Sequence, residues 1–599
     1  MIQAVHRHLP VLLLAAGLAA CSGAPPARPD PGSGAAAQPR RVIVISIDGA
    51  GAGALQELHR QGALQAGGFE RFFREGVVAD ALIPVDPTLT STNHISLITG
   101  FPPADTGIVA NQFHPGGTPA TERASGFEAP IGTETLWEAA RRQGRRVGVL
   151  AWPGADAQGE RRTADWGLAY NEAGERPPQL YLFSREDWKP LPPDLSPEGL
   201  VSHSPPLTDQ VTLGDKAGNF NLRIVAVDGT DDGQANYDSL VLHFPSGSGG
   251  LARIPIRAGE WQRLIWRHTG RATASWVKLT SLKPDLSEAL LFIDGVFHTL
   301  AYPGEVAAPL VQKGLYWPGP PNSFALASKW EGRPGIDIET WLEQAEHMTA
   351  FMGETLRLAA AREDWDLLLG YIPVIDQSGH RLLLLDERQP GFSPERRDEL
   401  ARARTRVWQM VDAELRKLID GLDLTRTTLV VVSDHGMAPV HTAIDPGVTL
   451  AELGLGPTAY AIGDGGVAYI HVENAPADGS LLADLARRYA DWQVKGEKPI
   501  EKILTRQEAA RLGIDHANSG DLVLFAREGY LFRTLPGGKA FGPAPVYGAH
   551  GHLNTHPDMH AVYMAIGAGV KPGPGGTVRT TEVAHRVSRW LGMDPPGRK

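Results

Sequence analysis

Short, mainly apolar runs recur along the chain, and they predict the strands of a parallel β-sheet. These runs span residues 42–47, 145–151, 366–372 and 427–433. A strand that is apolar on both faces is typical of a sheet covered by helices on both sides.

Helical patterns lie between these runs. Residues 338–362 form a long helical segment, and Ser393-Pro394 supplies a helix N-cap followed by a first-turn proline. Thr135 and Glu138 have the spacing of a capping box, so a further helix begins there. Strands that alternate with helices predict an α/β fold.

The alternation stops between residues 160 and 335, where short strand-like runs follow one another with turns between them. No long helical pattern interrupts them, which predicts an inserted all-β module, such as a small sandwich. The runs span residues 221–227, 238–244, 251–257, 261–267, 274–282 and 289–293.

The first forty residues predict export and a lipid anchor. A basic start precedes an apolar stretch, residues 9–20, that is too short to cross a bilayer and is typical of a signal peptide. The stretch ends in Leu-Ala-Ala-Cys21, which resembles a bacterial lipobox, where the cysteine carries the lipid. The alternative is an ordinary secretory signal with a chance cysteine. Ser22 after the cysteine favours the outer membrane, with the protein facing the periplasm or the cell surface.

These patterns divide the chain into five segments. A lipoprotein signal peptide, 1–21, and a flexible Pro/Gly/Ala-rich linker, 22–40, precede the folded part. The α/β domain follows in two parts, 41–159 and 336–599, around the β-rich module 160–335. Cys21 is the only cysteine, so the mature chain has no disulfide.

The charge balance bears on possible partners. The 599 residues include 57 Lys and Arg against 68 Asp and Glu, a net charge of −11. This balance argues against nucleic-acid binding through a basic surface. An acidic protein that handles phosphate groups needs local positive charge, which bound metal ions can supply.

Acidic and histidine side chains follow three of the predicted strands, and one more histidine lies in a glycine-rich loop. The carboxyl ends of parallel strands share one edge of a sheet, where α/β proteins bind their ligands. Taken singly, each residue could equally be a turn or cap residue. The set is Asp48, Asp376, His380, Asp434, His435 and His550. Asp376 and His380 are four residues apart, and we expect both side chains to converge from a turn.

A candidate nucleophile lies between the first two strands. Pro87 favours a turn, and the apolar residues at 95, 97 and 98 suit a short helix, so Thr90 lies just before a helix N-terminus. A threonine hydroxyl is a poor nucleophile unless a metal or a base lowers its pKa. Plain N-capping is the alternative role for this polar cluster.

Together these motifs resemble the type I phosphodiesterase/nucleotide pyrophosphatase family of the alkaline phosphatase superfamily. The resemblance covers roughly residues 41–155 and 338–590. It implies an alkaline-phosphatase-like sheet sandwiched between helices, and hydrolysis of phosphodiester or pyrophosphate bonds. The motifs that carry it are VIVISIDG at 42–49, PTLTSTNH at 87–94, TGFPPADTGIVAN at 99–111, SDHGM at 433–437 and GAHG at 548–551.

The resemblance also implies roles for the residues around the nucleophile. Thr90 is the expected nucleophile, and Asn111 with the Ser91 N–H is expected to hold a phosphoryl oxygen. Trp152, in a Trp-Pro-Gly sequence common in this branch, is expected to contact substrate. Ser91 departs from the family, because many nucleotide-cleaving members have an aromatic residue there to sandwich a nucleobase.

Two divalent metal ions are implied as cofactors. One would be held by Asp48, Asp434, His435 and the Thr90 oxygen, and the other by Asp376, His380 and His550. Carboxylate and imidazole ligands without thiolate suit zinc, with manganese and iron as alternatives. The histidines near the motifs that we do not expect to be ligands are His94, His114, His552, His556 and His560.

The expected substrate is a small phosphodiester or nucleotide-type compound. No Lys or Arg occurs from residue 147 to residue 159, where phosphomonoesterases of the superfamily usually place a clamp for the phosphate dianion. A phosphomonoesterase or phosphonate hydrolase is the enzymatic alternative. A non-catalytic lipoprotein that binds a partner through the β module is the alternative outside enzymes.

Overall fold

The computed structural model describes residues 41–598 except 120–121, 156–161, 171–175, 193–200, 216–217, 247–249, 269–270, 298, 457, 474–475 and 477. The predicted signal peptide, the linker and the lipidation site Cys21 lie outside the described residues. Within them, no helix combines the length and the apolar character needed to cross a membrane.

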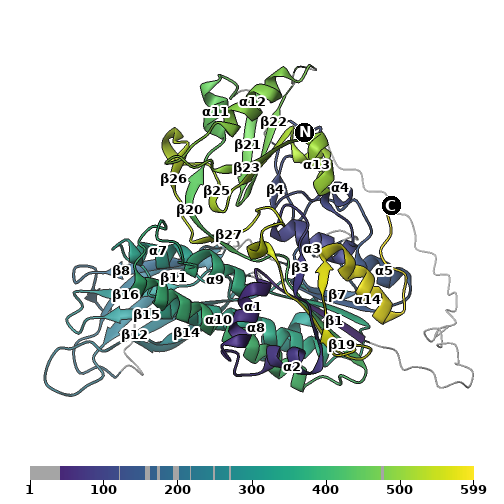
Figure 1. Cartoon of the computed structure of the whole chain (residues 1–599). Helices are drawn as coiled ribbons and strands as arrows, with labels where there is room; N and C mark the ends of the chain where they lie inside the picture. Colours follow the sequence, from purple (N-terminus) through teal and green to yellow (C-terminus); the bar gives the residue numbers. More distant parts are fainter. Residues whose placement is uncertain are drawn as a thin grey trace, which may run out of the picture. The chain divides into compact units, whose positions relative to one another are not determined.

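A nine-stranded sheet forms the centre of the α/β core (Figure 1). The first strand lies in the middle, parallel to both neighbours, with Val44 paired to Leu369 on one side and to Val430 on the other. The order across the sheet is β17 (Ala301–Tyr302), β7 (Trp166–Leu168), β6 (Val147–Leu150), β18 (Leu367–Ile372), β1 (Arg41–Ile47), β19 (Thr427–Val432), β28 (Tyr563–Gly567), β2 (Val77–Val78) and β29 (Gly573–Pro574).

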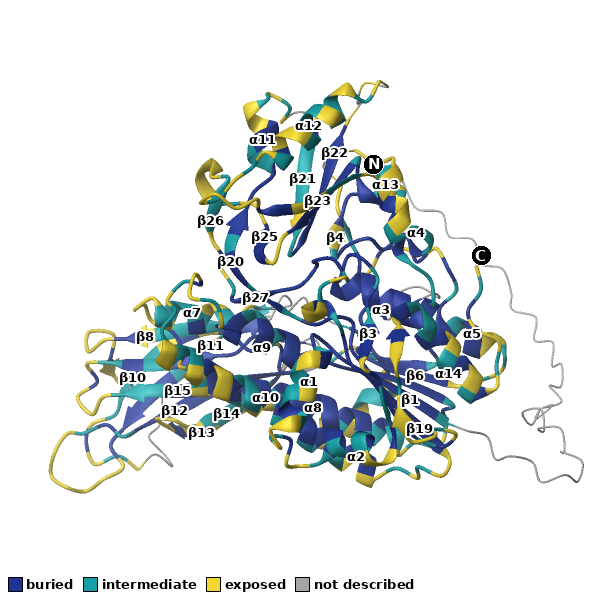
Figure 2. Cartoon of the chain, in the orientation of Figure 1, coloured by how far each residue is buried: buried dark blue, intermediate teal, exposed yellow. Residues whose placement is uncertain are grey.

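Helices cover both faces of this sheet. Successive side chains of each strand point to opposite sides, and because the strands are apolar throughout, both faces have to be buried. Along β1, Ile43, Ile45 and Ile47 pack into one core and Val42 and Val44 into the other. Figure 2 shows the strands buried between the two layers. The first core contains α1 (Ala52–Arg60), α2 (Gly68–Glu75), α8 (Ile338–Ala360) and α10 (Pro394–Asp420), and the second contains α3 (Thr90–Thr99), α5 (Leu136–Arg142) and α14 (Val583–Leu591). The predicted α/β fold is confirmed.

The inserted module is an antiparallel β-sandwich with its own apolar core. One sheet contains β13 (Leu251–Arg257), β12 (Ser239–Pro245), β11 (Gly218–Val227), β10 (Leu207–Asp215) and β9 (Lys189–Pro190). The other contains β14 (Trp261–His268), β15 (Arg271–Leu282), β16 (Ala289–Ile293) and β8 (Gln179–Phe183). The sandwich is narrower than the predicted range 160–335, because β7 and β17 inside that range belong to the central sheet.

A second insertion, which the sequence analysis did not separate from the catalytic domain, lies between the last two ligand motifs. It leaves the core after His435 and returns just before His550. Its two sheets are β20 (Ala438–Ile444), β25 (Gly529–Phe532), β26 (Phe541–Pro543) and β27 (Gly548–Ala549), and β21 (Ala459–Asp464), β22 (Val467–Val472), β24 (Leu522–Ala526) and β23 (Ile500–Thr505). Its helices are α11 (Gly447–Glu452), α12 (Ser480–Ala490) and α13 (Arg506–Ala509).

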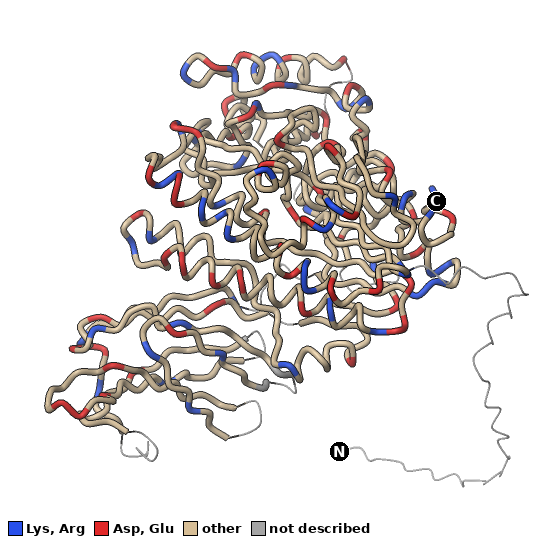
Figure 3. Tube along the Cα trace, turned by 60° about the horizontal axis from the view of Figure 1, so that its bottom comes forward, with Lys and Arg blue, Asp and Glu red and all other residues tan. Residues whose placement is uncertain are grey.

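Charged residues of both signs are interspersed along the chain in the view of Figure 3. Many of them are exposed pairs within one helix, such as Arg416 with Asp420 and Arg488 with Asp484. Pairs of this kind contribute little to stability.

Candidate metal centre and nucleophile

Three carboxylates meet at the carboxyl ends of β1, β18 and β19. Backbone hydrogen bonds hold them together: Asp376 N donates to the Asp48 carbonyl at 3.0 Å, and Gly49 N donates to Asp434 Oδ1 at 3.2 Å. All three are buried, with exposed fractions of 2, 7 and 0% for Asp48, Asp376 and Asp434. Their convergence follows from the parallel arrangement of the three strands.

Each carboxylate keeps one buried oxygen without a hydrogen bond: Asp48 Oδ1, Asp376 Oδ1 and Asp434 Oδ2. The second oxygen of Asp48 accepts a hydrogen bond from the Tyr371 hydroxyl at 2.5 Å. Leaving charged oxygens buried and unpaired costs several kcal/mol unless a cation meets them. This arrangement fits residues that bind metal ions.

Three histidines face these oxygens in the tautomer that a metal ligand needs. The Nδ1 atoms of His380, His435 and His550 lie 2.8, 2.9 and 3.0 Å from the carbonyls of Gly548, Gly436 and Thr88. A carbonyl only accepts, so each Nδ1 carries the proton and each Nε2 has its lone pair free.

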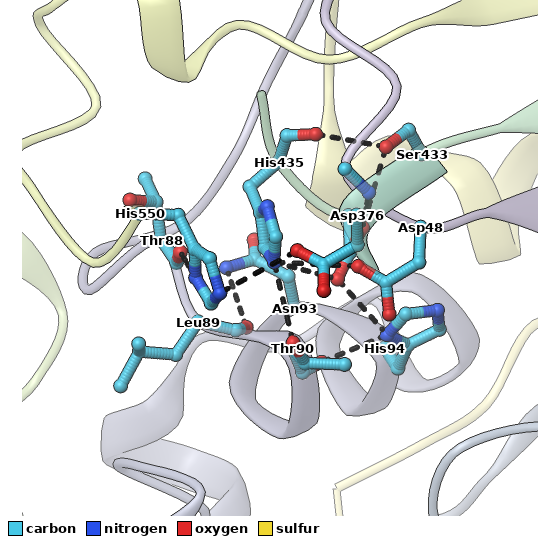
Figure 4. A network of polar contacts seen from close by, with 12 residues as sticks. Asp48, Thr88, Leu89, Thr90, Asn93, His94, Asp376, Ser433, His435 and His550 are labelled. Carbon is cyan, nitrogen blue, oxygen red and sulfur yellow. Dashed lines mark hydrogen bonds and ion pairs between the residues drawn. The ribbon is translucent and has the colours of Figure 1, made fainter. Parts of the chain in front are cut away.

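The Nε2 atoms lie close to the carboxylates, and Figure 4 shows His435 and His550 beside Asp376 and Asp48. His435 Nε2 is 3.1 Å from Asp434 Oδ2 and 3.5 Å from Asp48 Oδ1. His380 and His550 Nε2 are 3.4 and 3.7 Å from Asp376 Oδ1. His435 also groups with Asp376 and His550, within 4.8 Å of one another. It therefore lies between the two expected ligand sets.

The Asp376–His380 pair is presented by a helix, α9 (Val374–Leu382), and not by a turn as the sequence analysis expected. Residues four apart lie on one face of a helix, so the D-x-x-x-H spacing brings both side chains to the same place. The four-residue spacing suits a helix or a turn, which is why the sequence did not distinguish them.

A further group of possible ligand atoms includes His94 with Asp48 and Asp434. Both nitrogens of His94 are already used: Nδ1 donates to the Thr90 carbonyl at 2.8 Å and Nε2 accepts from Ser46 Oγ at 2.8 Å. A carbonyl on Nδ1 and a hydroxyl on Nε2 leave no lone pair for a metal. His94 therefore braces the first turn of α3 beneath Thr90.

Burial and mutual repulsion shape the ionisation of the centre. Burial raises the pKa of Asp48 well above its ordinary value, and the negative charges of Asp434 and Asp376 raise it further. Burial lowers the pKa of His550 well below its ordinary value, and the charges of His435 and His380 add to this. A neutral His550 and crowded carboxylates are what divalent cations stabilise.

Thr90 is the first residue of α3 and lies at the edge of this centre. Its hydroxyl Oγ1 is 3.2 Å from His435 Nε2, and its side chain is almost fully buried. The sequence analysis placed it just before the helix, and the structure places it one residue further on. The structure thus brings the expected nucleophile and the six expected ligands together.

The residues expected to contact substrate differ in position. The Ser91 N–H donates to Asn111 Oδ1 at 2.9 Å, so it is already used in the described structure. Of the two donors expected to hold a phosphoryl oxygen, the Asn111 amide nitrogen is therefore the one that remains available. Trp152 has no exposed surface and is absent from the described pocket lining. Its ring packs edge-on against His94, with ring centres 5.3 Å apart, so the structure gives it no direct path to a substrate.

A pocket of about 230 Å³ opens onto the centre, and the sequence analysis did not identify its outer wall. That wall contains Phe127, Tyr170, Trp317 and Met348, while Thr90, Asn111, Asp376 and His550 line the inner part. Phe127 and Tyr170 stack with ring centres 5.0 Å apart. No motif marks these residues, because Phe127, Tyr170 and Trp317 come from loops and Met348 comes from the helix α8.

The loop that carries Phe127 packs against Ser91, the residue after Thr90, and leaves room there only for a small side chain. A Cβ placed on Gly126 would lie 2.3 Å from Ser91 Oγ, so the loop that carries Phe127 lies directly against residue 91. A larger side chain at either position would displace the loop. Residue 91 therefore adds no aromatic surface to this pocket, and the closely stacked rings of Phe127 and Tyr170 leave no slot between them.

Comparison with known proteins gives a family match over most of the chain. The family described as type I phosphodiesterase / nucleotide pyrophosphatase matches residues 42–223 and 268–556. These two ranges contain every expected ligand, the nucleophile, and most of both insertions.

Individual relatives match over shorter stretches. Bis(5'-adenosyl)-triphosphatase enpp4 of Xenopus laevis is 29% identical over 133 residues, which is 22% of this chain and 28% of the relative. Ectonucleotide pyrophosphatase/phosphodiesterase family member 1 of Homo sapiens is 29% identical over 160 residues, which is 26% of this chain and 17% of the relative. The chain thus matches less than a third of either relative's length.

Among solved structures, murine ectonucleotide pyrophosphatase / phosphodiesterase 5 aligns over 94% of this chain and 97% of its own. The sequence identity is 14% and the TM-score is 0.48.

Proposed function

The chain belongs to the type I phosphodiesterase / nucleotide pyrophosphatase family, and on that premise we propose that it hydrolyses phosphodiester or pyrophosphate bonds with Thr90 as nucleophile. One observation carries the proposal. The Thr90 hydroxyl lies at the floor of an open pocket, beside three buried carboxylate oxygens without hydrogen bonds and three imidazole nitrogens with free lone pairs.

Two divalent metal ions, by preference zinc, are the proposed cofactors. Asp48, Asp434, His435 and Thr90 would hold one, and Asp376, His380 and His550 the other. When bound, such ions supply positive charge that stabilises the oxygens of an in-line displacement and lowers the pKa of a hydroxyl. The ligands lack thiolate, which suits zinc.

The surrounding residues orient the nucleophile. The His94 ring bonds to the Thr90 carbonyl and to Ser46 on β1, so the first turn of α3 is fixed to the central strand. The N-terminus of α3 directs its partial positive charge toward the pocket, which favours the anionic phosphoryl group. The Asn111 amide nitrogen is the proposed donor to a non-bridging oxygen.

The lining of the pocket favours diesters over monoesters. No Lys or Arg is among the described residues that line it. A phosphate monoester carries two negative charges and calls for a guanidinium or ammonium clamp, whereas a diester carries one and has a second substituent. Phe127, Trp317 and Met348 offer that substituent an apolar, aromatic wall. Nucleotide-type diesters, in which a nucleoside is the second substituent, fit this description.

We also propose that the protein is an exported lipoprotein attached through Cys21. The proposal rests on the N-terminal sequence. Outer-membrane attachment, facing the periplasm or the cell surface, would give the enzyme access to substrates outside the cytoplasm.

The test compares hydrolysis of bis-p-nitrophenyl phosphate with that of p-nitrophenyl phosphate by zinc-loaded protein. The expected result is faster turnover of the diester, with Thr90→Ala reducing it at least about a thousandfold. Thr92→Ala is the matched control, since Thr92 lies on the same helix turn with a hydroxyl that has no hydrogen bond. Preference for the monoester would favour the phosphomonoesterase alternative, and equal activity of Thr90→Ala would contradict the proposed nucleophile.

A further inference from the structure

A second cavity, of about 460 Å³, lies along the other face of the helix that carries the metal ligands. Ile375, Gly379 and Leu383 of the α9 region line it, whereas Asp376 and His380 line the substrate pocket. The described linings of the two cavities have no residue in common. The volume is within the range of about 300–1,000 Å³ that is typical of small-molecule sites.

The helices α1, α9 and α10 enclose this second cavity, which we call the back cavity. α10 contributes one face with Ala401, Arg404 and Trp408, and α1 contributes its first turn and Leu58. Met437, two residues after His435, closes the side toward the metal centre. The walls are therefore mainly apolar, and they are built on regular helices.

Arg404 is the one basic side chain among the described residues that line the back cavity, apart from the imidazole of His560. Its Nε is buried without a hydrogen-bond partner, and no ion pair of the guanidinium occurs in the described part of the chain. Burial alone lowers the pKa of Arg404 to about 10, so no neighbouring carboxylate compensates the charge. Arg404 is half-buried, and a guanidinium has five N–H donors, so it retains hydrogen-bonding capacity for a ligand; a buried donor without a partner, such as Nε, is costly.

The start of α1 adds two further donors. Gly53 and Ala54 lie in its first turn and line the same cavity. Their backbone N–H groups point along the helix axis without an intrahelical acceptor, because the first four N–H groups of a helix have none. Together with Arg404 they favour a negatively charged ligand group.

Two carboxylates limit how much negative charge the back cavity accepts. Glu57 is paired with Arg60 and Gln61, and Asp558 lies at the edge of the cavity, where burial raises its pKa. A cavity lined by one unpaired guanidinium and, away from it, by two acidic side chains suits a monoanion better than a phosphate dianion or a polyphosphate. Leu385, which is 51% exposed, extends the apolar surface at the mouth.

We infer that the back cavity binds an amphiphilic monocarboxylate, with its carboxylate on Arg404 and its apolar part against Leu58, Trp408 and Met437. A planar guanidinium pairs with a carboxylate through two parallel hydrogen bonds. This site is separate from the proposed hydrolysis and does not depend on it.

Isothermal titration of the full-length protein with octanoate tests the inference. Saturable binding is expected, with 1-octanol, octylamine and inorganic phosphate each binding at least about tenfold more weakly. Arg404→Met should weaken octanoate binding by about tenfold or more, because it keeps the apolar stem and removes the charge. Arg402→Met is the matched control, since Arg402 is exposed on the same helix, and binding should not change.

The melting temperature distinguishes loss of the site from loss of the fold. Arg404→Met should melt at or above the temperature of the wild type, because the variant removes an unpaired buried charge. A lower melting temperature would show that the guanidinium has a structural partner and would overturn the inference. No saturable binding by the wild type, unchanged binding by Arg404→Met, or equal binding of octanol or phosphate would each overturn it as well.

Discussion

His550 is tied to the residue two positions before the nucleophile: its Nδ1 donates to the Thr88 carbonyl at 3.0 Å. Gly551 N donates to Thr88 Oγ1 at 3.0 Å, and that hydroxyl donates to the His552 carbonyl at 2.8 Å. A ligand from the end of the chain is thus held by the segment that leads into α3. The proposed ligand His550 and the proposed nucleophile Thr90 are therefore positioned together.

Thr88→Val should therefore weaken metal binding without removing a ligand. The substitution keeps the shape but leaves the Gly551 and His552 groups short of one partner, which costs about 1–3 kcal/mol of stability. Zinc affinity, measured by competition with a chelator, should fall. Thr92→Val is the matched control: the Thr92 hydroxyl is buried without a hydrogen bond, so stability and affinity should be unchanged or higher. Equal affinities of both variants would contradict this coupling.

Tyr371→Phe should reduce zinc affinity about tenfold or more, the usual effect of removing a partner of a metal ligand. The Tyr371 hydroxyl donates to Asp48 Oδ2, and burial with the charge of Asp48 raises the pKa of the phenol well above its ordinary value, so it stays a donor. The readout is zinc retained after dialysis against graded chelator. Tyr563→Phe, another buried tyrosine of the sheet, serves as the control. Retention equal to that of the wild type would show that the hydrogen bond does not position Asp48.

Phe127→Ala should lower the preference for substrates with an aromatic substituent. Loss of a ring-to-ring contact is worth about 0.5–1.5 kcal/mol, so kcat/KM for a nucleoside p-nitrophenyl phosphate should fall about 2–13-fold more than that for methyl p-nitrophenyl phosphate. An equal loss on both substrates would place the substituent elsewhere in the pocket.

Ser91→Phe should not create a sandwich for a nucleobase. The Gly126 position lies against the Ser91 side chain, so the larger ring would have to displace the loop that carries Phe127. The expected cost is about 1–3 kcal/mol of stability, visible as a lower melting temperature. Improved turnover of nucleotide substrates with unchanged stability is the opposite outcome, and it would mean that the loop adapts freely.

Asp294, which directly follows β16 of the β-sandwich, should make the stability of the protein fall as pH rises. Burial raises its pKa from 3.8 to about 7, partly offset by hydrogen bonds from Gln344 at 2.9 Å and Gly295 at 2.8 Å. Between about pH 4 and 7 the folded state keeps a proton that the unfolded state has released. The free energy of unfolding therefore decreases with rising pH, by roughly 2–3 kcal/mol between pH 5 and pH 8.

Asp294→Asn should lose this contribution, and the melting temperatures at the two pH values measure it. The difference between pH 5 and pH 8 should shrink in this variant. It should persist in Asp231→Asn, whose carboxylate is 85% exposed. An unchanged difference in Asp294→Asn would show that the carboxyl is ionised throughout this range.

The sheet and its covering helices were predictable because their signals are local. Residues 42–47 and 427–433 are apolar on both faces, and Ser393 caps α10 as its sequence indicates. β7 and β17 were missed because strands of three and two residues show no periodicity. The insertion between β20 and β27 was missed because its strands and helices alternate in the same way as those of the core.

The part of the candidate site that could be predicted is the set of acidic and histidine residues that occur in short sequence motifs at the ends of strands. Asp48 and Asp434 each follow a buried strand, so both their type and their position are visible in the sequence. The outer wall was not predictable, because Phe127 and Trp317 meet the pocket only through tertiary packing. The bracing role of His94 also depends on contacts with β1 that lie 48 residues away in sequence.

The most direct test of the central claim is to trap the covalent intermediate on Thr90. Zinc-loaded protein would be mixed with bis-p-nitrophenyl phosphate, quenched in acid within milliseconds, digested and examined by mass spectrometry. The account predicts a p-nitrophenyl phosphoryl group on Thr90, present in the wild type and absent in Thr90→Ala. A turning-over enzyme with no adduct on Thr90, or with the adduct on another residue, would contradict the proposed nucleophile.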